Sequence, residues 1–157
     1  MTKWPTEAEC ESFYGKKGEN QTSLVLPYPM VLDWDKGTTV RRITCHEKVA
    51  APLGRIFAKI LEKYGQKQIT ALGLDQFGGC LNVRLKRGST KSWSIHSWGV
   101  AVDLDPDRNQ LRENHTTARF ARPEYDLFWS IVESEGAVSY GREKDFDWMH
   151  FQFARLK

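Results

Sequence analysis

The sequence predicts an α+β fold, with a small antiparallel sheet packed against a few helices. Two segments repeat apolar residues at helical spacing, and four shorter segments have the composition or alternation of strands. The chain of 157 residues is long enough to build its own hydrophobic core, so we expect residues 1–157 to form one domain.

The N-terminal part is predicted to hold a short helix followed by extended chain. Thr6 and Glu9 have the spacing of a capping box, and the helix that they begin should stop at Gly15. Segment 20–38 predicts extended pieces, broken by Pro27, Pro29 and a turn at Asp35-Lys36-Gly37.

Two longer helices are predicted further along the chain. A second capping box, Thr44 to Glu47, should open a core helix that stops at Gly65, and another helix should run from Pro123 to Gly136. The predicted strands are segments 68–74, 80–85, 100–105 and 148–153.

Composition and charge narrow the functional classes. The net charge of +3 is scattered apart from segment 84–91, so we do not expect nucleic-acid binding. Neither a membrane-spanning run nor a signal-peptide core is visible, so we expect no membrane insertion and no export signal. Three cysteines far apart in the sequence favour neither a disulfide framework nor a thiolate zinc site; they are Cys10, Cys45 and Cys80.

The segment SIHSWGVAVD, residues 94–103, places a histidine and an aspartate around an apolar alternation. Val100, Val102 and Leu104 should share one face of a strand, leaving Asp103 on the other. His96 and Asp103 are an odd number of residues apart, so a continuous strand would send them to opposite faces. A bend at Gly99 would bring both to one side.

A second histidine and carboxylate occur in segment 145–153, where His150 and Gln152 alternate with phenylalanines. Asp147 can join His150 on the polar face only if the chain turns between them. Two imidazoles and a carboxylate from adjacent strands suit zinc, whose catalytic sites have three protein ligands and leave a position for water. The neighbouring DLDPDRN segment lacks the glycine and glutamate of an EF-hand, so we interpret it as a turn shaped by Pro106 and Asn109.

These residues resemble the paired signature of the M15 zinc peptidases. SIHSWGVAVD fits Ser-x-His-x-x-Gly-x-Ala-x-Asp, and DWMH fits the Asp/Glu-x-x-His that accompanies it. The similarity extends over residues 78–109 and 141–153. It implies a fold like that of hedgehog and DD-peptidase domains, with Zn²⁺ bound by His96, Asp103 and His150.

The resemblance also implies roles for side chains around the metal. Asp147 is the expected general base, although Asp145 lies close by in the sequence. Arg84 resembles the arginine that steadies the substrate carbonyl or oxyanion, with Arg87 as the competing candidate. Ser94 is expected to bond a ligand or the substrate. Two further histidines, His46 and His115, are expected to face solvent.

The implied activity is hydrolysis of the peptidoglycan stem peptide. The chain most resembles single-domain phage endolysins, which would make it a monomer that cuts the L-Ala–D-Glu bond. Such an enzyme would stay in the host cytoplasm and reach the periplasmic wall after release. The alternatives are a D-Ala-D-Ala carboxypeptidase or dipeptidase, a non-catalytic zinc-stabilised envelope-binding module and, less favoured, a hedgehog-like signalling domain.

Overall fold

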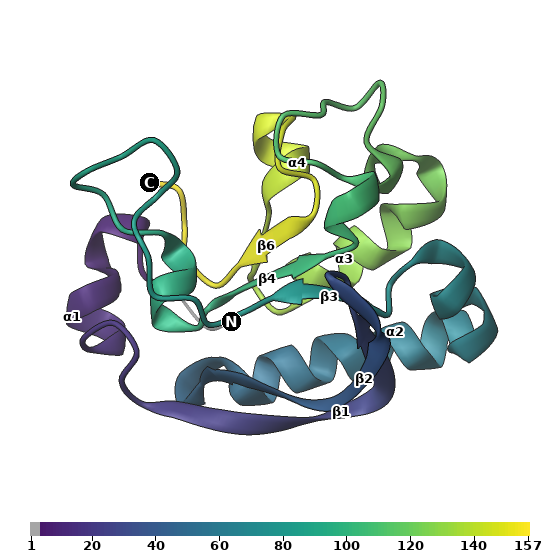
Figure 1. Cartoon of the computed structure of the whole chain (residues 1–157), viewed down its shortest axis with the longest axis horizontal. Helices are drawn as coiled ribbons and strands as arrows, with labels where there is room; N and C mark the ends of the chain where they lie inside the picture. The colour runs from purple at the N-terminus through teal and green to yellow at the C-terminus, as the bar shows by residue number, and fades with distance from the viewer. Residues whose placement is uncertain (1–3) are drawn as a thin grey trace.

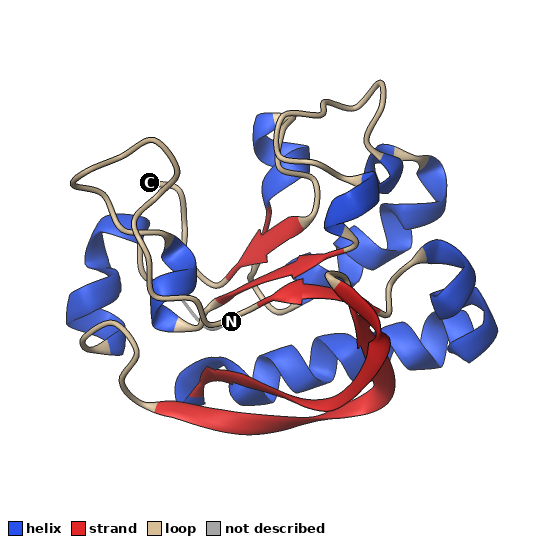
Figure 2. Ribbon diagram, viewed as in Figure 1, coloured by secondary structure: helices blue, strands red, loops and turns tan. Residues whose placement is uncertain are grey.

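A mixed six-stranded sheet forms the centre of the fold, with strand order β2-β1-β3-β4-β6-β5. The computed structural model describes residues 4–157 and confirms the α+β prediction (Figures 1 and 2). Neighbouring strands pair antiparallel, except that β1 and β3 pair parallel. The strands are β1 (Gln21–Leu32), β2 (Asp35–His46), β3 (Gln76–Gly79), β4 (Ala101–Leu104), β5 (Val138–Ser139) and β6 (His150–Gln152).

Strands β1 and β2 form a long hairpin. The two prolines do not end β1; instead the pairing with β2 shifts register between Val25 and Met30, because proline has no N–H to donate to the ladder. The turn lies at Asp33 and Trp34, two residues before the predicted position.

No helix within residues 4–157 is both long and apolar enough to cross a bilayer.

The long helix α2 (Glu47–Leu72) packs against β1 and differs from the prediction at both ends. His46, rather than Thr44, is its N-cap and accepts a hydrogen bond from the Lys48 backbone N–H. Gly65 does interrupt the helical geometry, with φ 76° and ψ 159°, but the helix resumes beyond it. The predicted strand 68–74 was therefore wrong, since Gly73 in the left-handed region ends the helix.

The predicted strand 80–85 was also wrong. This segment leaves the sheet as irregular chain, apart from an isolated bridge between Leu85 and Trp93. Its backbone N–H groups bond a different element: Asn82 donates to the His96 carbonyl, and Arg84 donates to the Ser97 hydroxyl. That element is the 3₁₀ helix η2 (Ile95–Trp98).

The remaining helices lie before the first strand and between the last strands of the chain. The N-terminal prediction is confirmed by η1 (Glu7–Glu9) and α1 (Cys10–Tyr14), which end at Gly15. The third predicted helix is confirmed by η5 (Pro123–Tyr125) and α3 (Asp126–Ser134), and α4 (Tyr140–Lys144) follows β5. All three cysteines are buried, and none of them forms a disulfide. Aromatic side chains dominate the core beside α3, among them Phe120, Tyr125, Phe128, Trp129 and Phe151.

Candidate metal centre and cleft

Two of the predicted ligands lie on the paired strands β4 and β6. Asp103 is directly opposite His150 in the antiparallel register, and Ala101 is opposite Gln152. The His150 Nδ1 atom lies 3.0 Å from the Asp103 Oδ1 atom. Both side chains therefore occupy the same face of the sheet, and the small Ala101 side chain leaves room beside them.

The third predicted ligand lies on η2, and the predicted bend at Gly99 brings it to the same face. Gly99 ends η2 in the left-handed region, with φ 69° and ψ 36°. A Cβ atom at this position would collide with the Gln21 side chain, so both backbone conformation and space favour glycine. The His96 Nε2 atom lies 3.1 Å from the Asp103 Oδ2 atom.

Together these side chains form a group that could hold a metal ion. One ligand atom from each of His96, Asp103 and His150 lies within 4.8 Å of the others. Burial raises the Asp103 pKa, but the two imidazoles outweigh it, so the net pKa lies well below its usual range. Burial lowers the His150 pKa, whereas the hydrogen bond and charge of Asp103 raise it, to about 9 overall. The donor set of two nitrogens and one carboxylate fits zinc.

Each imidazole is held through its other nitrogen. His96 Nδ1 lies 2.8 Å from the Cys80 carbonyl oxygen, and His150 Nε2 lies 2.7 Å from the Gln152 Oε1 atom. Such outer contacts are typical of metal-binding histidines. These contacts were not predicted from the sequence, although the i, i+2 spacing of His150 and Gln152 on a strand places both side chains on one face.

Asp147 lies next to this group, on the turn that the sequence analysis required. Its φ of 54° is left-handed, its N–H donates to the Leu111 carbonyl, and its carbonyl accepts from the His150 N–H. The Asp147 Oδ2 atom is 3.8 Å from His150 Nδ1. Burial raises the Asp147 pKa; His150, His96 and Arg87 counteract this, while Asp103 adds to it.

The neighbouring carboxylate points elsewhere. Asp145 accepts from the His115 backbone N–H and lies 2.7 Å from the His115 Nδ1 atom, and it also accepts from Trp148 Nε1. His115 is exposed, as predicted. The prediction that His46 faces solvent was wrong, since His46 is 1% exposed. Its Nδ1 atom accepts from the Lys48 N–H, and its Nε2 atom lies 2.7 Å from the Tyr14 carbonyl oxygen.

An open cleft of about 1100 Å³ extends over the metal-ligating group. Two loops contribute to its walls, one after β3 and one after β4, and both rise from the same side of the sheet (Figure 1). Lining residues on the first loop include Arg84, Lys86, Arg87 and Ser94, and on the second Arg112 and Glu113. Arg112 was not among the residues predicted from the sequence.

The predicted substrate-binding side chains differ in the hydrogen bonds that they make within the protein. Ser94 caps η2, since its hydroxyl accepts from the His96 N–H at 3.2 Å. The Arg84 guanidinium donates to the adjacent Leu85 carbonyl. Within residues 4–157 no group accepts a hydrogen bond from the Arg87 guanidinium. Its charge lowers the pKa of Asp147, so of the two arginines it is the one that acts on this carboxylate. Both arginines line the cleft.

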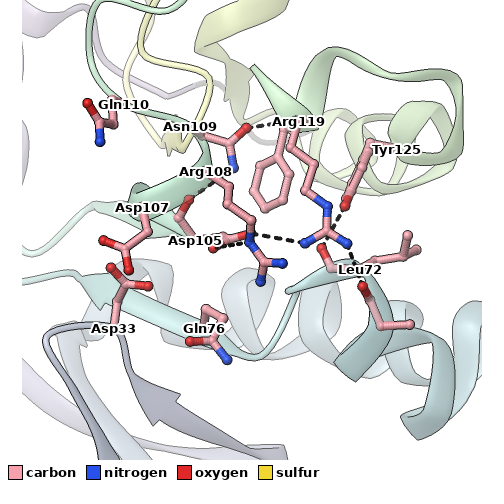
Figure 3. Close-up of polar contacts among 12 residues, drawn as sticks. Asp33, Leu72, Gln76, Asp105, Asp107, Arg108, Asn109, Gln110, Arg119 and Tyr125 are labelled. Carbon is pink, nitrogen blue, oxygen red and sulfur yellow. Dashed lines mark hydrogen bonds and ion pairs between the residues drawn. The ribbon is translucent and has the colours of Figure 1, made fainter. Parts of the chain in front are cut away.

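The turn after β4 is anchored by a buried carboxylate, which supports the predicted structural role of this segment. Asp105 is 1% exposed and forms ion pairs with Arg108 and Arg119 (Figure 3). The Asn109 side chain donates to the Asp105 carbonyl and accepts from the Phe120 N–H. These contacts fix the chain where it leaves the strand that carries Asp103.

The comparison with known families is consistent with this geometry. Residues 87–153 match the family model described as D-alanyl-D-alanine carboxypeptidase. This match supports the resemblance to the M15 peptidases over residues 87–153, which we call the M15 segment. The M15 segment includes every predicted metal ligand and Asp147, while Arg84 lies just outside it. Searches of the curated proteins and of the solved structures gave no match.

The match to this family supports a peptidase activity related to peptidoglycan. The family is usually zinc-dependent, and the group formed by His96, Asp103 and His150 could bind such a metal.

Proposed function

We propose that the protein is a zinc peptidase that hydrolyses the peptidoglycan stem peptide, and that His96, Asp103 and His150 are the metal ligands. The observation that carries this proposal is the convergence of these three donors in an open cleft, with Asp147 beside them. A structural zinc site is closed by a fourth protein ligand, whereas catalytic sites keep a position free.

The M15 segment supports a hydrolytic mechanism in which Asp147 is the general base. Bound zinc would lower the pKa of a water molecule toward about 7 and polarise the scissile carbonyl. Asp147 would accept the proton of that water and return it to the leaving amine. Its raised pKa brings it closer to neutral pH and thus suits a group that must give the proton back.

The cationic side chains of the cleft would hold the substrate. Arg84 or Arg87 can donate a forked pair of hydrogen bonds to a carboxylate or to the developing oxyanion. We propose the L-Ala–D-Glu bond as the scissile bond, because the neighbouring D-Glu carboxylate offers such an anion. The Ser94 hydroxyl, which already caps η2, is proposed to contribute a second contact to the substrate through its own proton.

We further propose that the protein acts as a monomeric single-domain endolysin of phage origin, which reaches the wall after release from the host cytoplasm. A D-Ala-D-Ala carboxypeptidase is the second candidate, favoured by the description of the matched family. A non-catalytic binding module is less favoured, because it would not need Asp147 beside an open metal position.

Digestion of purified Gram-negative sacculi separates these functions. Mass spectrometry should find new D-Glu N-termini with zinc-loaded protein, none with the chelated protein, and recovery after zinc is added back. Release of free D-alanine would instead establish the carboxypeptidase. Zinc-loaded protein that is folded and releases neither product would contradict catalysis and leave the binding module.

A further inference from the structure

Gln152 connects the candidate metal ligand His150 to the N-terminal segment of the chain. It is fully buried, and its Oε1 atom lies 2.7 Å from His150 Nε2. Its Nε2 atom lies 2.9 Å from the Ala154 carbonyl oxygen and 2.9 Å from the Glu7 Oε2 atom. The side-chain amide of Gln152 thus has a partner for its oxygen and for both of its N–H groups.

These contacts fix which way the amide points. The Ala154 carbonyl and the Glu7 carboxylate can only accept hydrogen bonds, so the NH₂ group of Gln152 must face them. A flipped amide would place its oxygen against two acceptors and its NH₂ against the imidazole. The orientation is therefore determined by the network, and the Gln152 oxygen faces His150 as an acceptor.

The orientation of the amide in turn determines the tautomer of His150. An acceptor at 2.7 Å from Nε2 requires the ring proton on that nitrogen. Asp103 Oδ1 lies 3.0 Å from Nδ1, so without a metal the ring can carry a proton on this nitrogen as well; a metal ion bound at Nδ1 would replace that proton, while the proton on Nε2 would remain. The unprotonated nitrogen is the one that a metal can bind.

We propose that Gln152 and Glu7 are positioning residues, which hold His150 in the ring orientation and tautomer that metal binding requires. This inference rests on the proposed function, since it takes His150 to be a ligand. Neither residue would touch the metal. Glu7 would act through Gln152, and Gln152 would act through His150.

Glu7 is suited to this role by its backbone and its charge. Its N–H donates to the Arg155 carbonyl at 2.9 Å, and Thr6 and Arg155 form a bridge, so the segment is tied to the chain beyond β6. A charged acceptor makes a stronger hydrogen bond than a neutral one. The start of the chain thereby stabilises a ligand near its end.

Two substitutions and a matched control test the proposal. Gln152→Met keeps a similar volume without the amide, Glu7→Ala removes the charged acceptor, and Glu11→Ala removes an exposed carboxylate that pairs with Lys17, away from His150. Zinc affinity should be measured by competition with a chelator. Gln152→Met should weaken it about 10–100-fold. Glu7→Ala should weaken it by less, and Glu11→Ala should leave it unchanged.

Nitrogen-15 NMR of the zinc-loaded protein gives a second measurement, the position of the ring proton of His150. This position would not change if Gln152 and Glu7 served only to stabilise the fold. The His150 ring proton should reside on Nε2 in the wild type. A proton on Nδ1, or zinc affinities of both variants equal to that of the wild type, would overturn the proposal. If Gln152→Met fails to fold, the zinc affinity of Glu7→Ala decides whether the positioning role holds, because Glu7 is less buried than Gln152.

The two proposals fail in different ways. A wild-type protein that binds no zinc would overturn the proposed function together with this inference. Zinc binding that both variants leave intact would overturn only the positioning role. Zinc binding that they weaken, in a protein that cleaves no peptide, would support the positioning role and contradict the peptidase.

Discussion

Asp103 and His150 lie directly opposite each other on β4 and β6, with 3.0 Å between Oδ1 and Nδ1. Their meeting depends on the register of the two strands, because a slip by one residue would send one side chain to the other face. The apolar partners on that other face, Val102 and Phe151, are fully buried and oppose such a slip. Core packing therefore fixes the geometry of the candidate metal centre.

Removing the carboxylate between the two imidazoles should abolish metal binding. Asp103→Ala should weaken zinc affinity by more than about 100-fold, since even residues that only support a ligand contribute about 10–100-fold. Chelator competition measures this. Asp107→Ala, at a largely exposed carboxylate just after the same strand, is the control and should keep wild-type affinity. Equal affinities in the two variants would contradict the ligand assignment.

Substitution of the proposed general base should separate catalysis from metal binding. Asp147→Asn is the suitable change, because asparagine tolerates the left-handed φ of 54° at this position. Peptide cleavage should fall about 10²–10⁴-fold while zinc affinity is retained.

The neighbouring carboxylate provides the control for Asp147. Asp145→Asn should retain most of the activity, because Asp145 faces His115 rather than the metal-ligating group. A loss of activity in Asp145→Asn but not in Asp147→Asn would show that the base had been assigned to the wrong residue.

Much of the candidate site could be predicted from the sequence because its residues follow local rules. Alternation places Asp103 and His150 on the polar faces of their strands, and a glycine between His96 and Asp103 provides the bend. The cross-strand pairing itself follows from no local pattern. The resemblance to a family supplied the step of bringing the two segments together.

The errors arose where local signals and tertiary contacts disagree. Gly65 breaks the helical geometry as predicted, yet the chain continues as helix beyond it. The glycine therefore interrupts α2 locally and does not end it. Segment 80–85 alternates like a strand, but the N–H groups of Asn82 and Arg84 bond η2, and the Arg84 side chain lines the cleft. The role of Glu7 could not be predicted, since its partner Gln152 is far away in the sequence.

Stability should depend on pH through Glu135, which joins the end of α3 to α2. Its carboxylate accepts hydrogen bonds from Arg55 and Lys59, and these lower its pKa below the ordinary 4.5 although burial opposes them. A carboxyl group with a lowered pKa in the folded state stabilises the protein above its ordinary pKa, and this contribution is lost as the pH falls.

Glu135→Gln should therefore reduce the free energy of unfolding by about 1 kcal/mol at neutral pH. The difference from wild type should shrink toward zero by about pH 3. Urea denaturation at both pH values measures it, with Glu133→Gln, at a more exposed ion pair with Arg142, as the control. A difference that stays constant with pH would show that Glu135 stabilises by packing and not by charge.

The bend at Gly99 should be required both for folding stability and for metal binding. Gly99→Ala would place a methyl group against Gln21 and force an alanine into a left-handed conformation, which costs about 1–2 kcal/mol before the collision is counted. Relief of the collision would shift η2, and with it the His96 ring. Gly88→Ala is the matched control, because its φ of 78° imposes a similar strain while its added Cβ meets nothing within 4 Å.

Two measurements compare Gly99→Ala with this control. Thermal unfolding should show a loss of stability in both variants, larger for Gly99→Ala, and chelator competition should show weaker zinc binding for Gly99→Ala alone. Equal zinc affinity in the two variants would mean that His96 keeps its place without this bend.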